Sequence, residues 1–264
     1  MEKHTVSASL TDNTKYMNRA LPVKKSFDII ERTLIIGGQN SAFYFIDGFT
    51  KDEIMLKLMD SFLNISADDM PEDATSFSTS CIPYVEVDIL GDFDSIFKNL
   101  LSGVTCLFID GYEAAIAIDC RTYPSRSIEE PDKDKSLRGS RDGFVETIVF
   151  NTALMRRRIR DPHLIMEMYE AGTSTRTDVA LCYMSDRVDR ELLTTIQNKL
   201  EESKSQDLKM SQQSLAEALF QRKWYNPFPK YKFTERPDTA CACLMEGKVI
   251  ILTDTSPSAL ILPT

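Results

Sequence analysis

Arginine is the residue type that could do most of the chemistry in this chain, and it is concentrated within residues 123–162. Two arginines flank a glycine-containing loop, and four more crowd the end of the helix that is predicted after it. In order, these are Arg138, Arg141, Arg156, Arg157, Arg158 and Arg160. Guanidinium groups bind carboxylates in bidentate geometry. We therefore predict that these arginines, together with Glu146, contact a neighbouring subunit.

The alternative is that the arginines are a solvated helix end. The spacing predicts a helix over 144–160, with one apolar side and the basic residues in its last turn. That side is formed by Phe144, Ile148, Asn151, Met155 and Ile159. Cations are favoured at this end by the helix dipole, so the cluster also has a purely structural explanation.

The loop before this helix, over 138–143, could also hold a small anion. Its glycines let backbone amides point outward, and helix N-termini attract phosphate or carboxylate groups. However, Asp142 and Glu146 are predicted in the first turn of the helix, and the spacing is not that of a P-loop. We favour a structural loop held by arginine–acid pairs, with Glu129 or Glu130 as partners. No ligand-binding residue is assigned.

The residues that most enzymes need are scarce in this chain. Its two histidines, His4 and His163, disfavour a histidine triad or a histidine-rich metal site. The aspartates that follow predicted strands, Asp47, Asp110 and Asp254, are typical of turns. Six cysteines lie mostly in apolar runs, which predicts buried thiols in a reducing compartment. We predict no catalytic residue, no metal and no cofactor.

Composition limits the possible partners. The formal net charge of −9 disfavours unaided binding to nucleic acid or to an anionic membrane. No apolar stretch approaches the roughly 20 residues of a spanning helix. The 264 residues can bury one large core or two small ones. The apolar run at the end of the chain indicates a piece of a longer protein.

The two halves of the chain have the same predicted order of elements. After a flexible polar arm over 1–25, the first half predicts strands at 27–36 and 42–46, a helix at 51–63, a strand at 84–90, a helix at 93–101, and strands at 104–109 and 114–119. The second half predicts strands at 165–170 and 179–184, helices at 189–200 and 211–220, a strand at 231–234, a helix at 237–245, and strands at 249–253 and 259–262. Thr50 and Glu53 predict a capping box on the helix at 51–63.

The predicted fold class is therefore α/β, with two similar small α/β subdomains that have mixed sheets. They cover 26–122 and 163–264, and a linking loop and basic helix over 123–162 joins them. Local similarity of 42–46 to 180–184, and of 103–110 to 247–254, supports a duplication. Convergent strand composition is the alternative explanation.

Several motifs of the chain are specific enough to point to a family. They are Arg126-Ser127-Ile128-Glu129-Glu130-Pro131, Arg138-Gly139-Ser140-Arg141-Asp142-Gly143-Phe144-Val145-Glu146-Thr147, Asn151-Thr152-Ala153-Leu154, Arg156-Arg157-Arg158-Ile159, Phe233-Thr234-Glu235-Arg236-Pro237-Asp238 and Glu246-Gly247-Lys248-Val249. Together these motifs resemble the spore-germination GerA family, specifically its A-subunit type. Within the family, Asn226-Pro227-Phe228-Pro229 before the Phe233 motif is most similar to the stage V sporulation protein AF branch.

This resemblance implies the N-terminal region of a spore membrane protein whose membrane domain follows. It further implies a homo-oligomer that forms an ion channel, other germination proteins of the spore membrane as partners, and a place on the cytoplasmic, spore-core side of the inner spore membrane. The leading hypothesis is an assembly and gating domain that takes part in germination. A small-molecule binding module between two lobes, and a soluble enzyme, are the alternatives.

Overall fold

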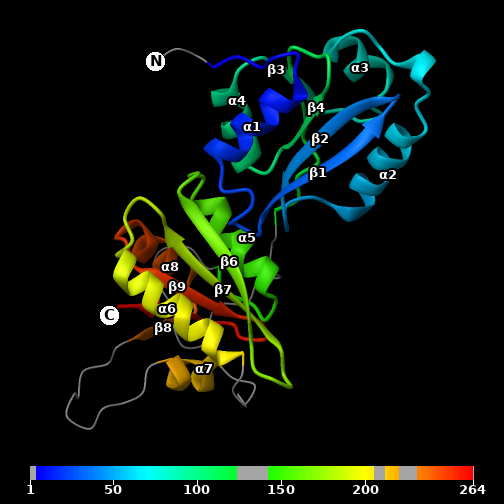
Figure 1. Cartoon of the computed structure of the whole chain (residues 1–264). Coiled ribbons are helices and arrows are strands. Elements are labelled where there is room, and N and C mark those ends of the chain that lie inside the picture. Colours follow the sequence, from blue (N-terminus) through cyan, green and yellow to red (C-terminus); the bar gives the residue numbers. More distant parts are fainter. Residues whose placement is uncertain (1–3, 124–141, 205–211, 220–230, 264) are drawn as a thin grey trace, which may run out of the picture. The chain divides into compact units, whose positions relative to one another are not determined.

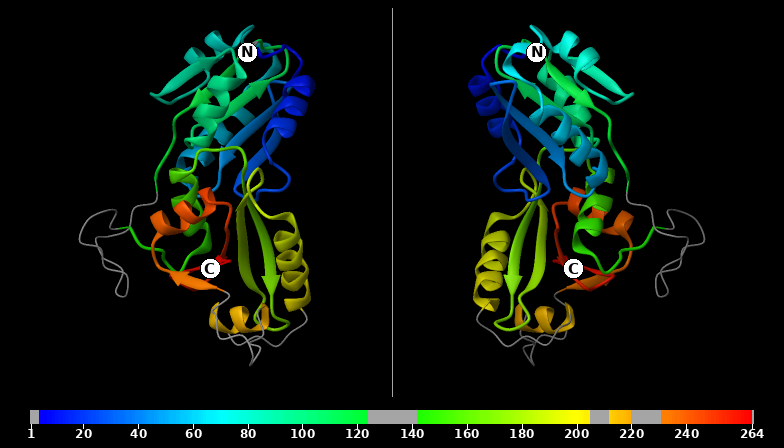
Figure 2. Two further views of the ribbon diagram at one scale, coloured as in Figure 1. Left: turned by 90° about the vertical axis from the view of Figure 1, so that its left-hand side faces the viewer. Right: turned by 90° about the vertical axis from the view of Figure 1, so that its right-hand side faces the viewer.

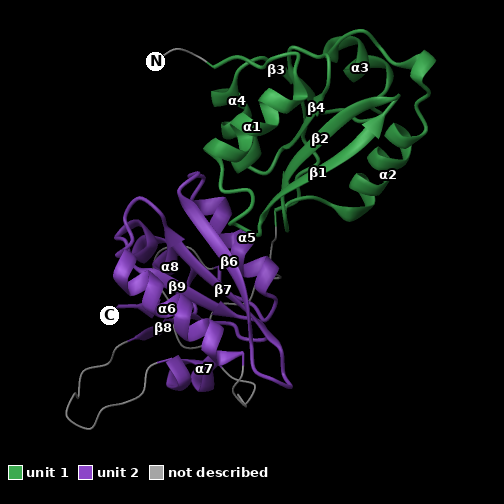
Figure 3. Ribbon diagram, viewed as in Figure 1, with its two compact units in different colours: residues 1–124 green, residues 125–264 purple. Residues whose placement is uncertain are grey.

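The computed structural model describes residues 4–123, 142–204, 212–219 and 231–263. The chain divides into two compact units, 1–124 and 125–264 (Figure 3). In the described part of the chain, no helix combines the length and the apolar character needed to cross a bilayer.

The first unit is a five-stranded antiparallel sheet between two layers of helices (Figure 1). Its main elements are α1 (Leu10–Ala20), β1 (Ile29–Ile36), β2 (Gln39–Ile46), α2 (Asp52–Leu63), α3 (Ala74–Ser80), β3 (Val87–Leu90), α4 (Phe93–Leu101), β4 (Thr105–Ile109) and β5 (Ala115–Ile118). The strand order is β1-β2-β4-β5-β3. Helices α2 and α3 bury their apolar sides on one face of the sheet, and α1 and α4 pack against the other.

The second unit repeats this architecture. Its elements are α5 (Ile148–Arg158), β6 (Leu164–Ala171), β7 (Thr177–Met184), α6 (Arg190–Ser203), α7 (Gln212–Leu219), β8 (Lys232–Thr234), α8 (Pro237–Met245), β9 (Val249–Thr253) and β10 (Ala259–Leu262). The strand order β6-β7-β9-β10-β8 matches that of the first sheet position by position. Helices α6 and α7 cover one face, and α5 and α8 pack against the other (Figure 2).

Strand register confirms the predicted correspondence between the halves. Ala42 on β2 lies opposite Phe108 on β4, and Ala180 on β7 lies opposite Leu252 on β9. The segments 42–46 and 180–184 therefore occupy the same place, as do 103–110 and 247–254. The prediction of mixed sheets was wrong, because every strand pair among the described residues is antiparallel. Direct hairpins join β1 to β2 and β4 to β5, and a short hairpin imposes that direction.

The predicted flexible arm over 1–25 was also wrong. Helix α1 lies within it, with Leu10 and Met17 buried against the sheet. The hydrophobic pattern is weak because the third buried residue of α1 is polar, Asn13. Likewise, α5 is not a separate linking helix. It is the first helix of the second unit, in the place that α1 has in the first.

A pair of equivalent asparagines fixes these two helices. In each, the side-chain amide of a buried asparagine accepts from the N–H and donates to the C=O of the residue six positions earlier. Asn13 bonds Ser7 in this way, at 2.9 and 2.6 Å. Asn151 bonds Val145 at 2.8 and 2.6 Å. An amide group carries both a donor and an acceptor, so one side chain can satisfy the N–H and the C=O of the same residue.

An aspartate after the sheet strand completes each helix start. The N–H of Leu10 donates to Asp110 Oδ1 at 2.8 Å, and the N–H of Ile148 donates to Asp254 Oδ1 at 3.0 Å. Both aspartates follow equivalent strands, β4 and β9. A carboxylate at this point satisfies an orphan N–H and complements the positive end of the helix dipole. The turn-forming role predicted for Asp110 and Asp254 was therefore incomplete.

Helix α2 begins without the predicted capping box. Its N-cap is Lys51, which makes no side-chain cap bond. Thr50 instead forms an isolated antiparallel bridge with Arg121. The backbone at Thr50 is thus held by a long-range pairing rather than by the local helix signal. Of the cysteines, Cys106, Cys120, Cys182 and Cys241 are buried, as predicted, and Cys81 and Cys243 are half-buried.

We expect Asn151→Ala to lower the free energy of unfolding by about 1–3 kcal/mol, because it removes both hydrogen bonds to the half-buried Val145. Asn13→Ala should have an effect of the same size through Ser7. Urea denaturation followed by circular dichroism would measure both. Asn198→Ala, at an exposed position of α6, is the control and should change stability by no more than about 0.5 kcal/mol. An Asn151→Ala effect as small as that of the control would contradict the role assigned to the amide.

Candidate functional site

Two of the sequence motifs meet in the second unit. The N–H of Phe144 donates to the C=O of Glu235 at 2.9 Å. This bond joins the segment before α5 to the segment before α8, although 91 residues separate them in the sequence. Helices α5 and α8 pack against each other on the same face of the sheet. The junction of the two motifs is therefore the candidate site, and it contains both acidic and basic side chains.

Charged groups are paired on each side of this junction. Arg158, in the last turn of α5, contacts the Asp142 carboxylate at 2.8 Å. Arg236 donates to both carboxylate oxygens of Asp238 at 3.1 and 2.5 Å. The hydrogen bonds from Arg236 hold the pKa of Asp238 below its usual range, and the nearby charge of Arg158 adds to this shift. Cys241 lies beside the pairs, and burial raises the pKa of its thiol to about 12, so it stays protonated.

The four arginines of the helix end have different environments. Arg156 is fully buried in its own unit and donates to the carbonyl oxygens of Asp161 and Leu164, at 3.1 and 3.0 Å. Arg158 is mostly buried, with 22% of its side chain exposed. Arg157 and Arg160 are exposed. Arg156 and Arg158 thus hold the end of α5 in place. Arg157 and Arg160 place their guanidinium groups at the surface.

The prediction that Arg156 contacts a neighbouring subunit is therefore corrected, because its guanidinium is enclosed by the loop that leads into β6. Glu146 is exposed, and its C=O accepts from the N–H of Thr255 at 2.7 Å. Arg138 and Arg141 lie outside the described residues, as do Glu129 and Glu130. The surface role of Arg157, Arg158, Arg160 and Glu146 stays a prediction.

The proposed anion site has a different geometry from the one expected. Helix α5 begins at Ile148, so Asp142 and Glu146 precede its first turn. The helix N-terminus is instead occupied by Asp254, from a strand more than 100 residues away. Asp142 pairs with the opposite end of the helix through Arg158. A protein carboxylate already takes the place that an anion would need, which disfavours an anion site at this helix end.

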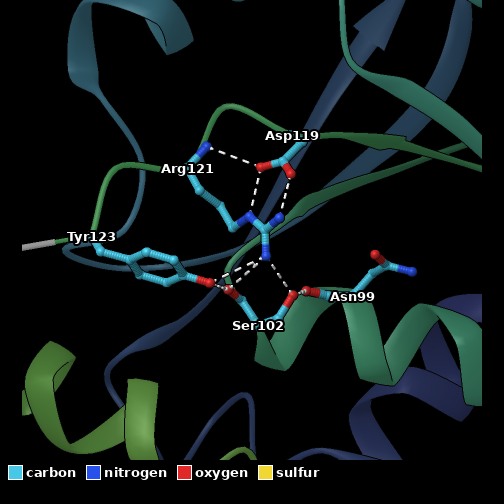
Figure 4. A network of polar contacts seen from close by, with 5 residues as sticks. All are labelled: Asn99, Ser102, Asp119, Arg121 and Tyr123. Carbon is cyan, nitrogen blue, oxygen red and sulfur yellow. Dashed lines mark hydrogen bonds and ion pairs between the residues drawn. The ribbon is translucent and has the colours of Figure 1, made fainter.

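Sequence reasoning missed a second polar cluster, in the first unit (Figure 4). Arg121 binds Asp119 with two nitrogens, one of them Nε at 2.6 Å from Oδ1. Its Nη1 donates to Ser102 Oγ at 3.0 Å and to the Tyr123 hydroxyl at 3.2 Å. The Tyr123 hydroxyl donates to the Ser102 C=O at 3.0 Å. A single arginine thus ties the end of α4 to the segment that follows β5.

A cavity of about 470 Å³ lies beside this cluster. Its lining residues are Tyr84, Val85, Glu86, Asp119, Arg121 and Tyr123. The guanidinium of Arg121 pairs with Asp119 and donates to Ser102 and Tyr123 of its own unit, so it acts as an anchor here rather than as an anion receptor. Within the described ranges, no cluster of three or more His, Cys, Asp or Glu side chains could hold a metal ion.

The chain is thus a duplicated α/β domain in which the segments before α5 and α8 meet. The model of the Bacillus/Clostridium GerA spore germination protein family matches residues 15–264, and the chain belongs to this family. Stage V sporulation protein AF of Bacillus subtilis (strain 168) is 34% identical over 100% of this chain and 53% of that protein. This relative also agrees with the branch predicted from the sequence.

Two further comparisons support the assignment. Spore germination protein KA of Bacillus subtilis (strain 168) is 29% identical over 98% of this chain and 47% of that protein. The crystal structure of the N-terminal domain of the A subunit of the Bacillus megaterium spore germinant receptor GerK3 has the same fold. Its TM-score is 0.71 at 22% identity, covering 100% of this chain and 98% of that one. The chain spans about half the length of the curated relatives it matches.

Replacing Arg121 with Ala should lower the free energy of unfolding by about 1–3 kcal/mol, because Asp119 and Ser102 lose their charged partner. Arg121→Lys should lower the free energy of unfolding by a smaller amount, since an ammonium group cannot reach Asp119, Ser102 and Tyr123 together. Thermal unfolding would rank the two variants. Arg32→Ala, at an exposed position of β1, is the matched control. Equal effects of Arg121→Ala and Arg32→Ala would refute the anchoring role.

The lowered pKa of Asp238 predicts a pH-dependent contribution to stability. Its stabilising effect is fully present above the unfolded pKa of about 3.9 and is lost as pH falls through the lower folded value. The difference in unfolding free energy between the wild type and Asp238→Asn should therefore be largest above about pH 5 and shrink toward pH 2. Denaturant titrations across this range would test it. A difference that does not vary with pH would contradict the ion pair, and exposed Glu246→Gln serves as the control.

Proposed function

We propose that this chain is the N-terminal assembly and gating domain of a GerA-family spore membrane protein that takes part in germination. In this proposal the full-length protein is a homo-oligomeric ion-channel subunit in the inner spore membrane, with the domain on the cytoplasmic, spore-core side. Membership of the family and the names of the relatives support a role in germination. A further relative, 30% identical over 97% of this chain and 49% of its own length, is named as the membrane protein YfkQ of Bacillus subtilis (strain 168).

The observation that carries the assembly role is the arrangement of the arginines at the end of α5. Arg156 and Arg158 are held inside the unit, so the backbone between and after them is fixed. The exposed side chains of Arg157 and Arg160 therefore extend from a fixed backbone. Arginine is enriched at protein interfaces, and a pre-ordered contact loses less entropy on association than a mobile one.

Other germination proteins of the spore membrane are the proposed partners. Relatives of this chain include spore germination proteins KA and B1 of Bacillus subtilis (strain 168), which supports a place in the same system. Binding of a germinant-like small molecule between the two units stays the alternative hypothesis. The absence of enzymatic activity also stays a prediction.

The test is charge reversal of the two exposed arginines in the full-length protein, as Arg157→Glu with Arg160→Glu. Breaking one side of an interfacial charge pair costs roughly 2–5 kcal/mol, which should shift the protein in detergent toward smaller species. Size-exclusion chromatography with light scattering would measure this, and spores carrying the variant should germinate more slowly.

The matched control is Arg190→Glu with Lys204→Glu, which makes the same charge change at the two exposed ends of α6. It should leave assembly unchanged. Arg156→Met is expected to destabilise the isolated unit and is therefore not a test of assembly. The proposal is wrong if the Arg157 and Arg160 variant assembles and germinates like the wild type.

A further inference from the structure

Helix α2 has a second apolar side that faces solvent. Its inner side packs on the sheet through Leu58 and Phe62, which are 1% and 0% exposed. Leu56 and Leu63 are 69% and 63% exposed. They lie seven residues apart, which places them on the same side of the helix, with half-buried Met59 between them. The outer side of α2 is thus an apolar ridge two turns long.

The duplication shows that the fold does not require this ridge. Helix α6 has the same place in the second unit, and its buried residues Ile196 and Leu200 have the spacing of Leu58 and Phe62. When the two helices are matched on these residues, Leu56 corresponds to Thr194 and Leu63 to Glu201. Both residues of α6 are polar and exposed. A neighbouring pair of exposed leucines, absent from the equivalent helix, indicates a contact surface.

The ridge is bordered by negative charge. Glu53 and Asp60 lie one turn to either side of Leu56, and both are exposed. The segment 52–73 contains seven carboxylates against the single base Lys57. Neither Glu53 nor Asp60 forms an ion pair with another described residue. A complementary partner would present an apolar group flanked by cations.

The end of α5 has this chemistry. Arg157 and Arg160 are exposed, and Phe150, which is half-buried, lies two turns before Arg157 on the same side of the helix. We propose that the outer face of α2 binds the end of α5 from a second copy of this chain. The carboxylates of Glu53 and Asp60 receive the two guanidinium groups, and the leucines pack against Phe150.

This inference rests on the homo-oligomer of the proposed function and names the surface that its arginines contact. The two faces differ, so the contact is heterologous: each copy uses its α2 face toward one neighbour and its α5 end toward the other. Repetition of such a contact generates a closed ring when the rotation closes. A ring is the arrangement that a channel along a central axis needs.

The first test is Glu53→Lys with Asp60→Lys in the full-length protein. We expect the protein concentration for half-dissociation of the oligomer in detergent to rise about tenfold or more. The matched control is Glu191→Lys with Glu201→Lys, the same charge change on α6. Leu56→Thr with Leu63→Gln, which copies the polar character of α6, should weaken assembly without lowering the melting temperature, because both side chains are exposed.

The decisive test combines the reversed faces. Glu53→Lys and Asp60→Lys, placed in one chain with Arg157→Glu and Arg160→Glu, should restore assembly to within about threefold of the wild type, since the charges are again complementary. Restoration supports the pairing. If the α2 variants assemble normally while the arginine variants do not, the inference is wrong and the proposed function stands.

Two other outcomes would also overturn it. If the α2 variants and the arginine variants each disrupt assembly, and the combined chain does not restore it, the two faces contact different surfaces. Normal assembly of the α2 variants with slowed germination means that α2 binds another protein. If neither the α2 variants nor the arginine variants change assembly or germination, both the interface of the proposed function and this inference are wrong.

Discussion

The buried asparagine at the start of α1 and of α5 is the constraint on which the rest of each unit depends. Its side-chain amide closes the extended segment before the helix, and an aspartate at the end of β4 or β9 caps the first helical N–H. These bonds fix the helix to the sheet at its N-terminus, where the helix alone leaves donors unsatisfied. The position of every later side chain of the helix follows.

In the second unit, this constraint determines which arginines reach the surface. With the start of α5 fixed by Asn151, its last turn lies over the loop into β6, where the Arg156 guanidinium finds two carbonyl oxygens. In the first unit the equivalent residue is Asn18, which donates to Glu31 at 3.0 Å. The same place in the fold thus holds a short amide in one unit and a buried cation in the other. Of the four arginines at this helix end, Arg157 and Arg160 are the exposed ones.

The duplication makes each unit a control for the other. Features shared by the two, such as Asn13 with Asn151 or Asp110 with Asp254, are what the fold needs. Features present in only one are free to serve another purpose. The exposed leucines of α2 and the basic end of α5 belong to this second group. This comparison within one chain separates stability from interaction using the structure alone.

Elements with local signals could be predicted from the amino-acid sequence alone. Helix α8 was predicted with its observed bounds because Pro237 and Asp238 favour the first turn, and β9 and β10 because they are continuous apolar runs between turns. Tertiary structure decided what depends on distant residues: α1, which buries few apolar side chains, the start of α5, capped by Asp254, and the burial of Arg156. Four neighbouring arginines look alike in a sequence, and only contacts with residues outside the helix separate the structural cations Arg156 and Arg158 from the surface ones.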